Sequence, residues 1–227
     1  MRVAALTFAL ALSLGAASSG AAVPGDRLAA LDHGTITVHA RASEPANPNI
    51  FGTVALDAGV TAYGARWRRV SAADQHDARV KALAATAVGS GADALTRLTM
   101  VHTAVGGRIR WKRDLDTYRV SDYWAQAGET LTRGEGDGED IAILKMQVLK
   151  AAGFSSRDIY LSVGRDQLRG ADTLLLVRIG SDFYALDDRS PMPVRALGGG
   201  RFRPVITLGR DNAWVHGRRM VARAAGR

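Results

Sequence analysis

The sequence predicts an α+β fold, with helices packed on one side of an antiparallel sheet. Helical spacing of apolar residues dominates the middle of the chain, up to Gly153. Short apolar runs with a period of two follow, and a run of helices before a run of strands is typical of this class. The third observation is a glycine-rich stretch, 134–140, which leads directly into an apolar helix.

The first residues predict a secretory signal peptide. Arg2 supplies the positive region, residues 3–14 the apolar region, and small residues follow up to Ala22. An apolar run of about a dozen residues is shorter than the roughly 20 that span a membrane. We therefore expect cleavage after Ala22, leaving a loosely held arm over 23–49 with a candidate edge strand at 35–38. One domain, 50–227, follows with no transmembrane segment, so the expected location is periplasmic or secreted.

Composition limits the chemistry. The chain has 227 residues, 30 Lys and Arg against 22 Asp and Glu, a formal net charge of +8 and no cysteine. The absence of cysteine excludes thiol catalysis, thiolate metal sites and disulfides. The arginines are scattered rather than clustered, and export argues against nucleic acid as a partner.

Capping and breaking residues place the expected helices. Ser71 is expected to cap a helix over 72–88, and a second helix is expected over 93–105. A short helix is expected from Tyr123 to Thr132. The central helix then begins after Asp137 and ends at Gly153, since glycine commonly terminates helices.

Period-two patterns place the strands in the last third of the chain. A lone strand is expected earlier, at 109–111, while residues 50–62 have no clear pattern. A hairpin turn is expected at 180–182. The strands expected after the central helix are Ile159–Val163, Thr173–Ile179, Phe183–Leu186, Phe202–Leu208 and Ala213–His216.

The central helix has a carboxylate capping pattern. Asp137 stands at the expected N-cap with Asp140 three residues later, which resembles a capping box. One apolar stripe is expected along the helix, formed by Ile141, Leu144, Val148 and Ala151. Position 138 lies at the positive end of this helix, where an enzyme would place a nucleophile, but it holds glycine.

Three segments together resemble the bacterial transglutaminase-like cysteine proteinases, exported relatives of periplasmic proteases that clip biofilm adhesins. The segments are 122–125, 137–140 and 186–189, and the resemblance extends over 51–216. In that family the central motif reads Gly-Asp-Cys-Glu-Asp. The resemblance implies a papain/transglutaminase-like fold whose central helix starts at the nucleophile position.

The family's Cys-His-Asp triad matches this chain at only one position. The Cys position falls on Gly138, the His position on Thr173 (or on Asp172 if the register slips by one), and Asp187 matches the Asp. An alternative for Asp187 is a polar strand end paired with Arg189. The resemblance thus implies an inactive pseudoenzyme whose vestigial cleft binds a peptide or protein partner in the cell envelope, such as an adhesin. The alternatives are an active peptidase, if Gly138 is not the true residue, or a structural envelope protein.

The resemblance also implies a calcium site. Related proteases bind calcium near the nucleophile, and the residues at the matching positions here are Asp137 and Glu139, with Asp140 beside them. Calcium takes roughly six to eight oxygen ligands. Further carboxylates are available at Asp114, Asp116 and Asp122. The alternative is that these side chains only cap the helix and favour its positive end.

Overall fold

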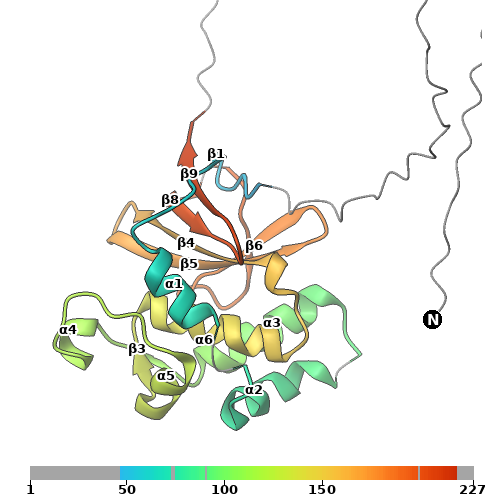
Figure 1. Ribbon diagram of the computed structural model, residues 1–227. Helices are drawn as coiled ribbons and strands as arrows, with labels where there is room; N and C mark the ends of the chain where they lie inside the picture. The colour runs from blue at the N-terminus through green and yellow to red at the C-terminus, as the bar shows by residue number, and fades with distance from the viewer. Residues whose placement is uncertain (1–46, 73–74, 90, 199, 219–227) are drawn as a thin grey trace, which may run out of the picture. The chain divides into compact units, whose positions relative to one another are not determined.

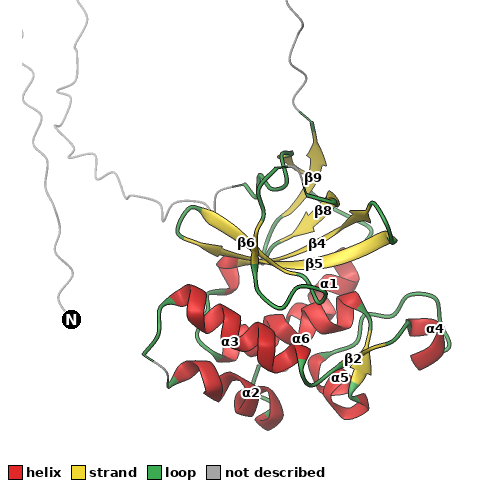
Figure 2. Ribbon diagram, turned by 180° about the vertical axis from the view of Figure 1, so that it is seen from behind, coloured by secondary structure: helices red, strands yellow, loops and turns green. Residues whose placement is uncertain are grey.

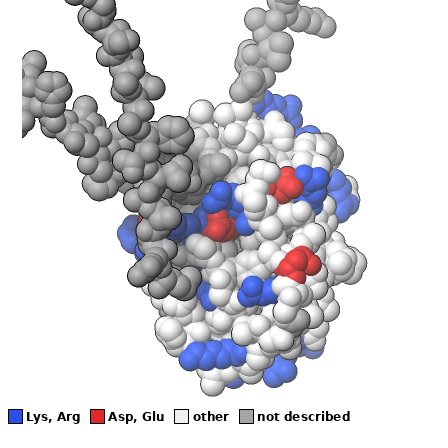
Figure 3. All heavy atoms as spheres, turned by 90° about the vertical axis from the view of Figure 1, so that its right-hand side faces the viewer, with Lys and Arg blue, Asp and Glu red and all other residues white. Residues whose placement is uncertain are grey.

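The computed structural model describes residues 47–72, 75–89, 91–198 and 200–218. The predicted signal peptide, most of the arm and the candidate strand at 35–38 lie outside the described residues. In the part described, helices cover one face of a seven-stranded sheet (Figures 1 and 2), which confirms the predicted α+β class. None of the described helices is long and apolar enough to cross a membrane. On the face shown in Figure 3, lysines and arginines are scattered rather than gathered in a block.

The large sheet is antiparallel throughout, with strand order β1-β9-β8-β4-β5-β6-β7. All five strands expected after the central helix are present, and Gly180 adopts φ +62° in the turn between β5 and β6. The pattern missed β1, which is held at the sheet edge by β9 and by the side chain of Asn49, the acceptor of the Ala55 amide at 2.8 Å. The strands are β1 Val54–Asp57, β4 Ile159–Asp166, β5 Gly170–Ile179, β6 Asp182–Leu186, β7 Val194–Arg195, β8 Phe202–Leu208 and β9 Ala213–Gly217.

The helices are α1 Gly64–Ser71, α2 Ala78–Val88, α3 Ala94–Gly106, α4 Asp114–Thr117, α5 Ala127–Arg133 and α6 Gly138–Ala151, with a 3-10 turn at Ser156–Asp158. The prediction that Ser71 caps a helix over 72–88 was wrong, because Ser71 ends α1. Helix α2 begins after Asp77, whose carboxylate accepts the Arg79 amide at 2.7 Å and supplies the cap. The expected strand at 109–111 is present as β2, Arg110–Trp111, which pairs in parallel with β3, Glu135–Gly136.

Helix α5 starts four residues later than predicted. The residues before it are held extended by buried carboxylates: Asp114 accepts the Tyr123 amide at 2.5 Å, and Asp140 accepts the Ala125 amide at 2.7 Å. These bonds tie the chain between α4 and α5 to the start of α6. The sequence pattern could not show this, because both acceptors come from other elements.

Helix α6 lies between the sheet and the other helices and is buried on every side (Figures 1 and 2). The expected single apolar stripe is therefore too narrow. The polar Lys145 and Gln147 are also buried, and donate to the carbonyl oxygens of Leu186 (3.2 Å) and Val70 (2.7 Å). Buried polar groups need such partners, so these two bonds fix the position of α6 against the sheet and α1.

Candidate functional site

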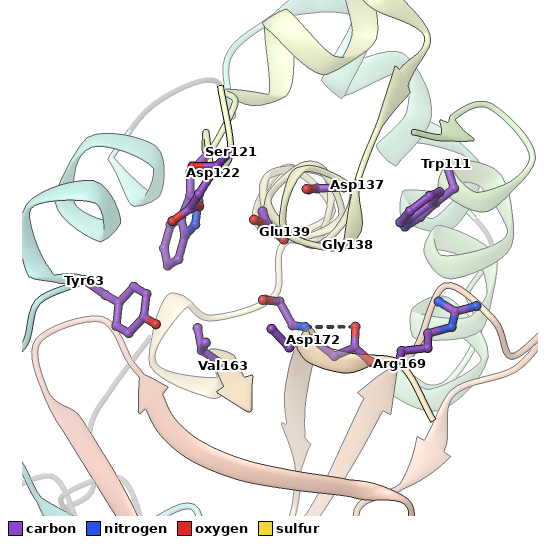
Figure 4. Close-up of a pocket in the computed structure, with 13 residues that line it drawn as sticks. Tyr63, Trp111, Ser121, Asp122, Asp137, Gly138, Glu139, Val163, Arg169 and Asp172 are labelled. Atoms are coloured by element: carbon purple, nitrogen blue, oxygen red, sulfur yellow. Dashed lines mark hydrogen bonds between the residues drawn. The ribbon is translucent and has the colours of Figure 1, made fainter. Parts of the chain in front are cut away.

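The N-terminus of α6 opens into a cleft of about 730 Å³. The opposite wall is formed by β4, β5 and the turn between them, and the sides by β2, Tyr63 and the segment between α4 and α5. Figure 4 looks along α6 into this cleft, with Tyr63 and Asp122 on one side and Trp111 and Arg169 on the other. No sequence pattern indicated Trp111 or Arg169, because their place in the cleft depends on β2 and on the β4–β5 turn.

The three glycines before α6 have different structural roles. Gly134 ends α5 in the left-handed conformation, at φ +66°. A Cβ on Gly136 would lie 2.7 Å from the Cβ of Asp140, so a side chain does not fit there. A Cβ on Gly138 would instead make ordinary contacts of 3.7 Å, with the Asp172 Oδ1 and the Thr173 carbonyl oxygen. Gly138 is thus the one of the three where a side chain would fit and is missing.

The structure places both candidates for the His position beside Gly138, but with different atoms. The side-chain carboxylate of Asp172 faces Gly138, whereas Thr173 presents its backbone oxygen at the same distance. The Asp172 Oδ1 also accepts the Thr173 amide at 3.0 Å. Burial raises the pKa of Asp172 even though Arg189 lies next to it.

Arg189 joins Asp172 to Asp187. Its guanidinium binds Asp187 through two bonds of 2.6 Å, and its Nη2 lies 2.8 Å from Asp172 Oδ2. A third carboxylate, Asp166, lies 3.2 Å from Nη1. Burial alone would raise the pKa of Asp187, but the hydrogen bonds from Arg189 outweigh it and the pKa is lowered. The pairing of Asp187 with Arg189, given above as the alternative, is therefore present. Arg189 also binds Asp172 on β5.

A second set of carboxylates, two buried and two half-buried, lies around the first turn of α6. Asp140 is fully buried and Asp114 is 2% exposed. Burial and then repulsion from neighbouring carboxylates raise the pKa of Asp137 to about 7, of Glu139 to about 9 and of Asp140 to about 8. Such shifts mean that the folded protein disfavours the charged form of these carboxyl groups, which a bound cation would favour.

These carboxylates form two overlapping groups, in each of which one oxygen per residue lies within 4.8 Å of the others. One contains Asp114, Asp137 and Asp140, and the other contains Asp114, Asp122 and Glu139. In the first group each residue has a buried oxygen with no hydrogen-bond partner: Asp114 Oδ1, Asp137 Oδ1 and Asp140 Oδ2. Three carboxylates that lie this close together, each with a buried oxygen that lacks a partner, fit a hard cation such as calcium.

The structure differs from two expectations: the capping box of Asp137 and Asp140, and the place of Asp116 among the clustered carboxylates. Asp137 occupies the N-cap position of α6, but its side chain makes no capping hydrogen bond, so the capping box is absent. Asp140 instead uses one oxygen to hold Ala125. Asp116, considered as a further ligand, lies outside both groups and pairs with Arg113 at 2.9 Å.

Comparisons with solved structures support the fold. Two solved structures of LapG from Legionella pneumophila are similar in fold. The calcium-bound form is 21% identical with a TM-score of 0.52, covering 66% of this chain and 86% of LapG. The EGTA-treated form is 20% identical with a TM-score of 0.52, covering 69% and 87%. No curated protein sequence matches the chain.

Residues 58–197, more than half of the chain, match the family described as bacterial transglutaminase-like cysteine proteinase. The matched region contains α1 to α6, the strands β4 to β7 and every residue of the cleft described above. This confirms the resemblance found in the sequence. The chain therefore belongs to the family of bacterial transglutaminase-like cysteine proteinases.

Proposed function

We propose that this protein is a catalytically inactive member of its family, which binds a peptide segment of an envelope protein in the cleft at the start of α6. The observation that carries the proposal is the cleft itself. It has a volume of about 730 Å³, and Gly138, where it meets α6, has no side chain. A cleft of this size fits a short stretch of extended peptide.

The reason for inactivity is the loss of two of the three triad groups. Gly138 takes the place of the nucleophile and Asp172 that of the general base. We favour Asp172 over Thr173 because its carboxylate faces Gly138 and is joined through Arg189 to Asp187. Asp172 is paired with a guanidinium, and it has no thiol to deprotonate because the whole chain lacks cysteine. Transfer of an acyl group requires a nucleophile that this site does not have.

Calcium is the proposed ligand of the carboxylates Asp114, Asp137 and Asp140, with Glu139 beside them. The missing capping bond of Asp137 and the unpaired oxygens of all three support a metal rather than a purely capping role. The name of one similar LapG structure records bound calcium. In this chain the ion would neutralise the buried charge and fix the segment between α4 and α5, which forms one side of the cleft.

The proposed location is periplasmic or secreted, on the basis of the leader sequence at 1–22. The proposed partner is a protein of the cell envelope, such as an adhesin. The proposal includes no nucleic-acid partner and no transmembrane segment.

The test is binding of a library of acetylated, amidated hexapeptides to the purified mature protein, in calcium and in EGTA. We expect binding without cleavage, and at least a tenfold loss of affinity in Gly138→Leu, whose side chain would fill the cleft. Gly106→Leu is the matched control, because a Cβ at Gly106 meets nothing within 4 Å. Peptide cleavage by the wild type would refute inactivity. Equal binding by wild type and Gly138→Leu would exclude the cleft as the binding site, and no binding at all would favour a structural role.

A further inference from the structure

We infer that the ligand of this cleft carries an acidic segment, which leaves the cleft across three arginines of the sheet. Arg165 lies on β4, Arg169 in the turn between β4 and β5, and Arg203 on β8. These three residues are called the arginine surface below. The inference rests on the proposed function, because it specifies the ligand of the same cleft. It does not involve the calcium site, since the arginine surface is separate from both carboxylate groups.

The arginine surface continues one wall of the cleft. Arg169, labelled in Figure 4, and Ala171 both line the cleft. Arg165 stands opposite Ala171 on one side and opposite Arg203 on the other. Residues directly opposite each other in an antiparallel pair lie on the same face of the sheet. The side chains of Ala171, Arg165 and Arg203 therefore form one row, which begins in the cleft and runs outward across the sheet.

Two like charges are neighbours in this row, and the protein supplies no counter-charge. Like charges directly opposite each other in an antiparallel pair are destabilising. The two carboxylates of the same hairpin, Asp166 and Asp172, are bound by Arg189 at 3.2 and 2.8 Å. Among the described residues, no Asp or Glu forms an ion pair with any member of the arginine surface. An anionic group of a ligand would remove this repulsion.

The backbone fixes the positions of these arginines. The register of β4 against β8 shifts at Gly164, directly before Arg165. A Cβ on Gly164 would clash with the carbonyl oxygen of Arg203, so the two strands approach this closely only because residue 164 is glycine. In the turn, Asp166 Oδ1 accepts the Arg169 amide at 3.3 Å. A ligand therefore meets a preformed surface, which lowers the entropic cost of binding.

A carboxylate of a peptide is the anionic group that fits this surface. A guanidinium binds a carboxylate through two parallel hydrogen bonds, so one Asp or Glu of the ligand can bind between Arg165 and Arg203. The row begins inside the cleft, and the headgroups of an intact bilayer could reach only its outer part. The carboxylates at the start of α6 repel an acidic side chain from the facing wall. The acidic segment thus lies next to the stretch of peptide that fills the cleft.

The experiment extends the tightest-binding hexapeptide of the library by three glutamates, at each end in turn. Each product is compared with its counterpart carrying three glutamines, by fluorescence anisotropy in excess calcium. We expect one glutamate peptide to bind about tenfold more tightly than its counterpart at low salt, because each exposed ion pair contributes up to about fivefold. The difference should shrink at high salt, since salt screens exposed charges.

Matched variants separate local contacts from overall charge. Arg165→Gln combined with Arg203→Gln should remove the preference for glutamate, without loss of stability in urea, because it also removes the repulsion. The control is Arg157→Gln combined with Arg218→Gln, which removes the same charge from exposed arginines that do not line the cleft. This control should keep the preference, although it lowers the formal net charge of +8 equally.

The failures are distinguishable. If glutamate and glutamine peptides bind equally while Gly138→Leu still weakens binding, the inference is overturned and the peptide-binding function stands. The inference is also overturned if both double variants weaken the preference equally, or if the Arg165→Gln, Arg203→Gln protein loses stability and the binding of all peptides alike. Phosphatidylglycerol vesicles test the other source of anions: binding to them through Arg165 and Arg203, with no preference among peptides, overturns the inference. If no peptide binds, with or without an extension, the proposed function fails and the inference fails with it.

Discussion

Replacing Asp140 by asparagine should stabilise the protein without calcium and weaken its response to calcium. Asp140 is fully buried; its Oδ1 accepts the Ala125 amide, and its Oδ2 has no partner. Burial raises its pKa from 3.8 to about 8. For a carboxyl group with a raised pKa, the stabilising contribution is present below the unfolded-state pKa and is lost as pH rises through the folded-state value.

The magnitude follows from that shift. At pH 7 the Asp140 side chain is ionised in the unfolded chain but mostly protonated in the metal-free folded protein. This pH lies about three units above the unfolded-state pKa. Folding without metal is then penalised by up to about 4 kcal/mol relative to a neutral side chain. Asparagine keeps the acceptor for Ala125 and removes this penalty. We therefore expect Asp140→Asn to raise the free energy of unfolding in EGTA, by at most that amount.

In calcium the difference in the free energy of unfolding between the two proteins should become smaller. Wild type should gain about 2.7 kcal/mol when calcium is present at 100 times its dissociation constant, whereas Asp140→Asn has lost a charged ligand and should gain little. The assay is urea unfolding at pH 7 in EGTA and in excess calcium, with Asp116→Asn as the control that should match wild type in both. The reasoning is refuted if Asp140→Asn is less stable than wild type in EGTA, or if it retains the full response to calcium.

Three further predictions test other parts of the structure. Gly138→Cys should fold normally and react with iodoacetamide, yet cleave no peptide; adding Asp172→His should give measurable cleavage, whereas a gain from Thr173→His instead would show that our register is wrong. Gly164→Ala should cost about 1–3 kcal/mol in urea unfolding, because its Cβ would lie 2.3 Å from a backbone oxygen of β8; unchanged stability would refute the clash. Burial lowers the pKa of His216 to about 4, so the stability it contributes is present above pH 6.5 and is lost as pH falls through 4. The stability of wild type relative to His216→Gln should thus fall by up to about 3 kcal/mol between pH 7 and pH 4, and a constant difference would contradict this.

On the proposal made above, the groups around Gly138 differ in their chemistry from those of a working triad. In a working triad an imidazole lies between the nucleophile and the orienting carboxylate. Here a carboxylate, Asp172, faces Gly138, and the positive charge comes from Arg189, which also binds Asp187 and Asp166. The same strand and hairpin are held together by ion pairs instead of a catalytic hydrogen bond. On that proposal, ion pairs that do not depend on turnover hold this wall of the cleft in place.

The sequence alone determined the fold class, the family and the lack of a thiol nucleophile. The fold class rests on periodicity within single strands and helices, and the family on a short contiguous motif around Gly138, so both can be recognised locally. The same local reasoning failed at Ser71, where a cap was expected six residues before the real one at Asp77. Two cap-like residues so close together cannot be ranked without knowing that Trp67 and Val70 of α1 are buried.

Only the tertiary structure decided what surrounds Gly138. The contact of Asp172 with that position depends on the register of β5 against α6, which differs from the neighbouring alternative by one residue. The convergence of Asp114 with Asp137 and Asp140 depends on two backbone amides, those of Tyr123 and Ala125, which bind the carboxylates of α4 and α6. Such contacts join residues that are 9 and 15 positions apart in the chain, and no periodic pattern encodes them. The strength of these hydrogen bonds depends on burial. Burial is set by the packing around α6 and cannot be read from the linear sequence.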